Sequence, residues 1–213
     1  EALEEVHRML QEKLKNIPPE DIVQPSPRIA IPSLQNASIT EESEVRELYA
    51  SLLANSMNKV VKDGVHPAFI EIIKQLSPDE AKILRYMSIF SSVPTISLRA
   101  ENKDQSGITV INCFSNIGEL MKCEKPYDIG KYFDNLERLG VIRRSGAFES
   151  FTDKSIYEPL KSHEFIKEKE HSIQNSLDRN IPNILEGFVE ITSFGRAFCD
   201  TCVTVELNIT IAT

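Results

Sequence analysis

The sequence predicts a mainly α fold of the α+β class, in which an N-terminal helical part precedes a winged-helix-like part with a small antiparallel sheet. Apolar residues recur three or four positions apart through the first part of the chain, which is the period of amphipathic helices. The β-rich runs begin only after residue 90. A length of 213 residues with 41% hydrophobic content suits one or two globular domains. We expect a helical region over 1–76 and a winged-helix-like region over 77–213, with a polar insertion at about 145–186.

Residues 3–17 predict the first amphipathic helix, which Pro18 and Pro19 end because proline lacks the backbone N–H and clashes with the preceding turn. Five prolines between 18 and 33 predict an extended crossing, with a helical turn near Ile31 to Ala37. A long helix is then expected from an N-cap at Thr40 to a glycine cap at Gly64.

The stretch VHPAFIEIIKQLSPDEAKIL, residues 65–84, predicts two short helices with a sharp junction. Ser77 has the pattern of an N-cap, Pro78 takes the first helical position, and Glu80 completes a capping box. Each helix presents a narrow apolar stripe that needs a neighbour. We therefore expect one buried group from both helices, and we expect the helical and winged-helix-like parts to meet at the Ser77–Pro78 junction. The residues expected in that group are Phe69, Ile73, Leu76, Leu84 and Met87.

The remainder of the chain predicts the order of elements found in winged-helix proteins. Strand-like runs at 91–100 and 107–114 are followed by helical segments at 115–122 and 128–139 and a short strand at 141–143. A long polar loop, a strand at about 188–192 and a helix from about Ser193 complete this order. The last residues, 203–213, alternate apolar and polar side chains and predict another strand.

Charge and composition limit the classes of function. The net charge of −8 and the pI near 5.1 argue against a duplex-binding protein, because such proteins usually carry a basic domain. The sequence contains no run of 18 or more apolar residues, so we predict no membrane span. Four cysteines are few for a secreted scaffold, so we expect a reducing, cytoplasmic location. The sequence opens on Glu1, which suggests a fragment of a longer chain.

Three stretches of this sequence carry a family resemblance. They are EESEVRELYASLLANSM, VHPAFIEIIKQLSPDEAKIL and ITSFGRAFCDTC. Together they resemble the bacterial abortive infection alpha family over about residues 25–203, and His66-Pro67 and Leu76 to Pro78 are the most specific parts. The family name implies resistance to bacteriophage, in which the infected cell stops growing or dies before phage matures. The resemblance implies no catalytic residues, so none can be transferred to this chain.

Residues with the potential for chemistry do not form a recognised motif. Cys199 and Cys202 form a CxxC, but a second pair with similar spacing is missing, so packing in a helix is favoured over metal or redox work. His163 and His171 lie eight apart within an acidic run, which does not fit the HExxH spacing. His66 is expected to anchor a turn. We predict no catalytic residue, no metal and no cofactor.

The candidate partner or nucleic-acid surface consists of Lys131, Arg138, Arg143 and Arg144, on and after the helix expected at 128–139. Residues 122–144 hold six basic and four acidic side chains, which is a weak positive balance for a DNA-reading helix. The leading hypothesis is a non-enzymatic phage-defence protein that presents a surface to a protein partner. A winged-helix DNA-binding regulator is the alternative, and a nuclease-type effector enzyme is the third. The trigger, the target and the oligomeric state are left open.

Overall fold

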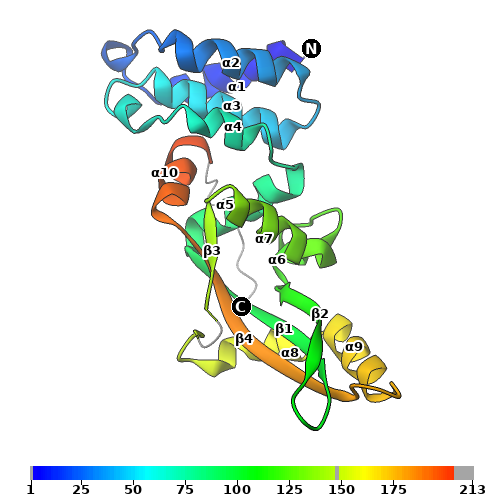
Figure 1. The fold of residues 1–213 in the computed structure, drawn as a ribbon. Helices are drawn as coiled ribbons and strands as arrows, with labels where there is room; N and C mark the ends of the chain where they lie inside the picture. Colours follow the sequence, from blue (N-terminus) through cyan, green and yellow to red (C-terminus); the bar gives the residue numbers. More distant parts are fainter. Residues whose placement is uncertain (1, 147–148, 204–213) are drawn as a thin grey trace. The chain divides into compact units, whose positions relative to one another are not determined.

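The structure, a computed structural model, describes residues 2–146 and 149–203, and these form two compact units. The first unit holds the chain up to residue 89 together with the segment from 193 onward, and the second unit holds residues 90–192. Helices come first and the sheet follows, so the predicted α+β class is confirmed (Figure 1). The sequence predicts a division after residue 76, whereas the compact units divide after residue 89. The two predicted domains, 1–76 and 77–213, stay a prediction.

The first unit is a helical assembly around α3 (Ser43–Ser56). Helices α1 (Ala2–Leu14), α2 (Pro27–Ile39), α4 (Ala68–Ile73) and α10 (Ser193–Cys202) contact it, and α5 (Pro78–Phe90) follows α4 along the chain. Short 3-10 turns lie at Pro19–Asp21 and Lys62–Gly64. Nine of the residues of α3 are buried, and they lie on most sides of the helix, which explains why it needs several neighbours.

Helix α2 corrects the extended crossing expected for the proline-rich segment, because it runs without a break from Pro27 to Ile39. Pro27 occupies a position in the first turn, where a backbone N–H has no intrahelical partner to lose. Pro32 lies inside the helix and removes one hydrogen bond, the bond its N–H would have made to the Arg28 carbonyl. Ile29 and Ala37 of α2 are buried, and their packing helps to offset the lost hydrogen bond.

The expected start and end of the third helix are also wrong. Helix α3 begins at Ser43, and Glu42 occupies its N-cap position without a side-chain cap bond. Thr40 follows the end of α2, where its hydroxyl donates to the Asn36 carbonyl at 2.9 Å. Gly64 belongs to a separate 3-10 turn, because α3 stops at Ser56.

The junction between α4 and α5 has the capping box that the sequence predicts. The Glu80 carboxylate accepts the Ser77 backbone N–H at 2.7 Å, and the Ser77 hydroxyl accepts the Glu80 N–H at 3.3 Å. These two bonds satisfy donors that a helix start leaves without partners. The five apolar side chains expected to be buried around this junction are all buried: Phe69, Ile73, Leu76, Leu84 and Met87.

The second unit is built on an antiparallel sheet whose described strands follow the order β2-β1-β4-β3. Strands β1 (Ser92–Glu101) and β2 (Gly107–Phe114) form a hairpin. Strand β1 pairs over its whole length with β4 (Ile181–Ile191), and β3 (Ile142–Arg144) pairs with the last three residues of β4. Helix α6 (Ile117–Leu120), a 3-10 turn at Pro126–Asp128 and helix α7 (Ile129–Arg138) connect β2 to β3.

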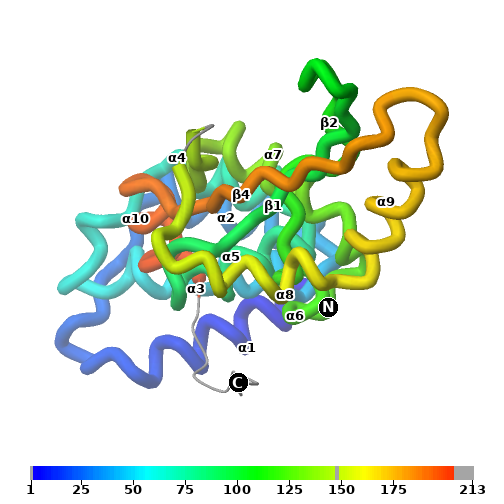
Figure 2. The backbone as a smooth tube through the Cα atoms, turned by 90° about the horizontal axis from the view of Figure 1, so that it is seen from below, coloured from blue at the N-terminus to red at the C-terminus, as the bar shows by residue number. Residues whose placement is uncertain are grey.

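The region expected as a polar insertion at 145–186 contains ordered elements. A 3-10 turn at Lys154–Tyr157, α8 (Glu158–Lys161) and α9 (Glu164–Gln174) follow β3, and β4 already begins at Ile181. Helix α9 contacts β1 and β4 beside the sheet (Figure 2), where Ile173 packs with Leu98 and Ala100. The buried Tyr157 hydroxyl donates to the Gly187 carbonyl at 2.9 Å, which fixes the start of this region to β4.

Two further expectations concern membranes and the end of the chain. Among the residues that the structure describes, helices are too short or too polar to cross a bilayer. The strand expected at 203–213 lies almost entirely outside the described residues.

Candidate interaction surface

Helix α7 and strand β3 carry the four basic residues predicted for a partner or nucleic-acid surface. Lys131 and Arg138 are on α7, and Arg143 and Arg144 are on β3. The helix buries an apolar face and ends at Arg138, and Gly140 just beyond it has a φ of 73°, a conformation that glycine adopts without strain. The chain reverses direction at Gly140 and runs back along α7 as β3.

Arg144 connects β3 to α7. Its guanidinium donates to the Gly130 carbonyl at 3.1 Å and to the Asp134 carboxylate at 2.5 Å. The Glu137 carboxylate lies 3.6 Å from the same guanidinium and also accepts the Arg144 backbone N–H at 3.1 Å. Only 21% of the side chain is exposed. Arg144 therefore serves the packing of this unit, and its charge is balanced by two carboxylates on α7.

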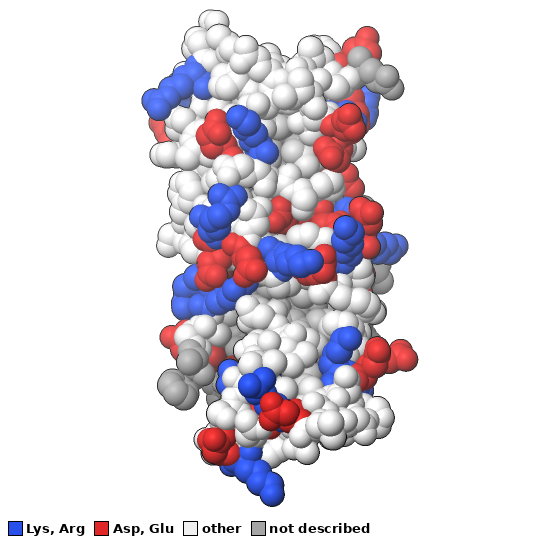
Figure 3. Space-filling model, turned by 45° about the vertical axis from the view of Figure 1, so that its right-hand side comes forward, with Lys and Arg blue, Asp and Glu red and all other residues white. Residues whose placement is uncertain are grey.

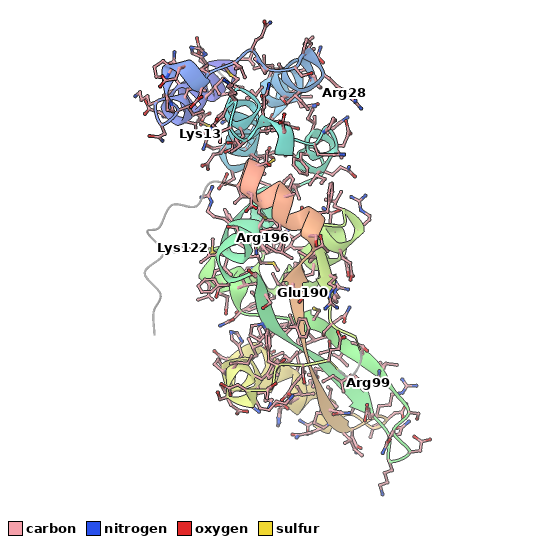
Figure 4. All side chains as sticks on the ribbon, turned by 90° about the vertical axis from the view of Figure 1, so that its left-hand side faces the viewer. Lys13, Arg28, Arg99, Lys122, Glu190 and Arg196 are labelled. Atoms are coloured by element: carbon pink, nitrogen blue, oxygen red, sulfur yellow. The ribbon has the colours of Figure 1, made fainter. Side chains whose placement is uncertain are left out.

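Arg143 points to different partners. It donates to the Glu190 carboxylate on β4 and lies 3.4 Å from the Glu149 carboxylate. Its guanidinium also lies over the Phe188 ring, 5.8 Å from the centroid. The hydrogen bond to Glu190, which projects from β4 (Figure 4), raises the pKa of Arg143 above its ordinary value. The structure thus binds Arg143 to β4 and Arg144 to α7, and the two arginines share no partner among these contacts.

Lys131 and Arg138 are both exposed on α7. The Lys131 ammonium lies 2.9 Å from the Asp128 carboxylate, and 75% of its side chain is exposed. Arg138 donates twice to the side-chain oxygen of Asn135, at 3.1 and 2.6 Å. Basic and acidic side chains alternate on the face shown in Figure 3, where no extended patch of one sign is visible.

A cluster of aromatic side chains with a histidine lies elsewhere in the second unit, and the sequence analysis missed it. The Tyr127 and Phe165 rings stack with centroids 4.5 Å apart and an interplanar angle of 2°. Phe114 meets His163 edge-on at 5.1 Å. These residues come from the end of β2, the turn before α7 and the start of α9, so they join segments up to about fifty positions apart in sequence. No local sequence pattern predicts such a cluster.

Glu119 connects the polar atoms of this cluster. Its carboxylate accepts the Tyr127 hydroxyl at 2.9 Å and lies 2.7 Å from His163 Nε2. His163 Nδ1 accepts the Phe165 N–H at 3.2 Å as the cap of α9, so the proton of a neutral ring lies on Nε2, toward Glu119. The hydrogen bond to Glu119 raises the pKa of Tyr127. The arrangement satisfies each polar group and holds α9 beside α6.

His66 and the cysteines behave as the sequence predicts for structural residues. His66 Nδ1 accepts the Ala68 N–H at 3.1 Å, which anchors the turn before α4. Cys199 and Cys202 are buried on α10, and burial raises the pKa of Cys199 to about 12 and that of Cys202 well above its ordinary value. Thiols held in this way are poor nucleophiles. In the described parts of the chain, no three His, Cys, Asp or Glu side chains are grouped to hold a metal ion.

Comparisons with known proteins give a family but no characterised relative. The sequence matches the family described as "Abortive infection alpha" over residues 1–202. No curated protein matches the chain. The solved structure of an uncharacterised protein from the hydrocarbon-degrading marine bacterium Alcanivorax borkumensis SK2 is similar at 20% identity, with a TM-score of 0.44, and the match covers 64% of this chain and 92% of that one. The family match spans nearly all of the sequence, and the chain belongs to the abortive infection alpha family.

Proposed function

We propose that this protein defends a bacterial cell against phage as a non-enzymatic interaction module in the cytoplasm. The observation that carries the proposal is the family match over residues 1–202, since the family is named for abortive infection. In abortive infection the infected cell stops growing or dies before phage progeny mature, so neighbouring cells are spared.

A protein partner is favoured by the charges around α7. Arg143 and Arg144 form ion pairs with carboxylates of the same unit, and the exposed Lys131 forms one with Asp128. A phosphate backbone would have to compete with each of these carboxylates, at a net charge of −8 for the whole chain. A protein surface that offers both signs of charge meets no such penalty.

Phage challenge tests the proposal. The full-length protein, expressed in its native host, is expected to lower the plating efficiency of at least one phage in a broad panel. Leu76→Asp, which puts a charge at a buried position of the first unit, serves as the unfolded control and should lose protection. Full plating of every phage on cells that contain folded protein would contradict the proposal.

A DNA-binding regulator is the second candidate, and the arrangement of the sheet favours it. Helix α7 leads directly into β3, and β4 lies between β3 and β1, which is the strand order of a winged helix. The discriminating experiment is binding of purified protein to random duplex over a range of salt concentrations. Lys131→Glu with Arg138→Glu should abolish any such binding if α7 reads DNA. If binding is absent, or is unchanged in this variant, the DNA reading fails.

A nuclease-type effector keeps third place. Metal-dependent degradation of nucleic acid by the purified protein would favour it over both other functions.

A further inference from the structure

The outward face of α2 is apolar and almost free of charge. The exposed residues of α2 recur three or four positions apart, so they share one face of the helix, which lies at the outside of the first unit (Figure 1). They are Pro27, Arg28, Ile31, Leu34, Gln35 and Ile39. Ile31, Leu34 and Ile39 are 55%, 42% and 78% exposed. Arg28 is the only charged residue between positions 22 and 40.

The outward faces of other helices differ from this one. The exposed residues of α1 include Glu4, Arg8 and Glu12, and those of α9 include Lys167 and Glu168. Single apolar residues on a protein surface are ordinary, whereas several on one uncharged face mark a site of contact with a partner. The outward face of α2 therefore has the composition of an interface.

The opposite face of α2 is already used by the first unit. Ile29, Ser33 and Ala37 are buried there, against the other helices of the unit. Apolar residues thus lie on both sides of α2, a distribution typical of a helix that is covered from both sides. The contacts within the unit account for one of these sides, and the side that carries Ile31 and Leu34 is left for a partner.

The two ends of the outward face carry charges of opposite sign. Arg28 lies in the first turn and projects away from the unit (Figure 4). Glu41 and Glu42 follow the last turn, and both are exposed. Among the described residues, none of these three side chains has an ion-pair partner. Their charges are available to a partner of complementary charge.

Neighbouring side chains leave this difference between the ends in place. A hollow of about 450 Å³ beside the first turn is lined by Arg28 together with Lys62 and Asp63, so cations exceed anions by one at that end. A hollow of about 210 Å³ beside the last turn is lined by Glu42 and Lys74. With Glu41 next in sequence to Glu42, anions exceed cations by one at this end.

We propose that α2 packs antiparallel against α2 of a second copy of this chain. A two-fold axis between Leu34 and Gln35 places these residues of both copies at the centre, and Ile31 of each copy opposite Ser38 of the other. The same axis brings Arg28 of each copy to the end where Glu41 follows the helix of the other copy. Antiparallel packing also sets opposite ends of the two helix dipoles side by side.

Charge favours a second copy as the occupant. The partner helix has to be uncharged opposite residues 29–40 and has to carry charges in the reverse order at its two ends. Read in the antiparallel direction, α2 itself meets both conditions. An uncharged contact also lets two chains, each with a net charge of −8, approach without like charges opposite each other at its centre.

The size of the contact sets its strength. A helix of this length is about 20 Å long and about 10 Å wide. A contact confined to it falls below the roughly 1,200–2,000 Å² that stable interfaces bury in total. We therefore expect a weak, reversible dimer. This inference does not depend on the proposed function, because association of the purified protein is measured without phage.

Sedimentation equilibrium of the full chain, from about 5 to about 500 μM, tests the pairing. The mean mass of the wild type should rise toward twice the monomer mass, while Ile31→Glu and Leu34→Glu should each stay at the monomer mass. Ile108→Glu is the matched control, because Ile108 is 52% exposed but lies in the second unit, and it should associate like the wild type. A monomeric wild type, or glutamate variants of α2 that associate equally well, would overturn the proposal.

Exchange of the charges at the ends of α2 tests the antiparallel direction. Arg28→Glu alone should weaken association about tenfold, and so should Glu41→Arg with Glu42→Arg, because each change sets like charges opposite each other at both ends. All three substitutions together restore opposite charges and should recover the wild-type affinity. If the triple variant associates no better than Arg28→Glu, the antiparallel arrangement is wrong.

An introduced cysteine gives a direct readout of the contact. The four native cysteines are buried, so Leu34→Cys adds an accessible thiol beside the two-fold axis. Mild oxidation should link two copies through this thiol, and Ile108→Cys should link far less. Equal linking of the two variants would contradict pairing of α2. If removal of residues 204–213 abolishes association and Ile31→Glu does not, that segment forms the contact, and pairing of α2 is wrong.

Discussion

Replacement of Arg144 by alanine should destabilise the second unit measurably. The change removes the guanidinium bonds to the Gly130 carbonyl and the Asp134 carboxylate, and the ion pair with Glu137. Hydrogen bonds to charged groups contribute about 1.5–3 kcal/mol each when shielded from water. Here the carboxylates of Asp134 and Glu137 are 62% and 41% exposed and regain water after the change, so the contribution is smaller. We expect a total loss of about 1–3 kcal/mol in the free energy of unfolding.

Lys131→Ala is the matched control for this change. Lys131 also carries a positive charge on the same structural unit, but it is highly exposed and pairs with Asp128 three residues before it. Its loss should cost about 0.2–0.5 kcal/mol. Urea unfolding followed by circular dichroism compares the two variants with the wild type. If Arg144→Ala unfolds at the same urea concentration as Lys131→Ala, Arg144 is not a structural tie, and its charge is available to a partner after all.

Three further outcomes are expected. Leu76→Ala should lower the free energy of unfolding by about 2–5 kcal/mol and Ser77→Ala by only about 0.5–2 kcal/mol. Thermal unfolding compares the two variants. If Leu76→Ala is destabilised no more than Ser77→Ala, this junction is not part of the core. Hydrogen bonds to two lysines lower the pKa of Glu186 below 4.5, so its stabilising contribution is present near neutral pH and disappears as the pH falls through that lowered pKa. The difference in urea midpoint between the wild type and Glu186→Gln should therefore shrink in acid, and a constant difference would contradict this. Cys199 and Cys202 should resist a thiol reagent at pH 8 until the protein unfolds, and rapid labelling of the native protein would contradict their burial.

Local patterns in the sequence predicted those elements whose signal lies within a few residues. The capping box at Ser77 and Glu80 formed as predicted, because both partners lie within one turn. Strand β2 has the predicted bounds, since β-branched residues dominate it. The proline rule failed for α2, because the lost hydrogen bond and the clash that the interior Pro32 causes can be offset by tertiary packing.

The sequence predicted which residues form the candidate surface, but not all of their partners. The four basic residues could be located on α7 and β3, but the carboxylates that pair with Arg143 lie outside this segment, as Glu190 on β4 does. Charge counts within a segment cannot show which cations are neutralised by distant carboxylates. The cluster around Glu119, Tyr127 and His163 was missed for the same reason, since its members meet only after α9 has packed beside α6.

The growth of infected cultures tests the central claim most directly. Native host cells that express the full-length protein are infected by a phage whose plating the protein reduces, once with few phage per cell and once with several. The account predicts that the culture survives the first infection and collapses in the second without releasing normal numbers of progeny, because infected cells are lost while their neighbours are spared. Survival of the infected cells themselves, or a normal phage yield at both ratios, would contradict abortive infection as the function of this protein.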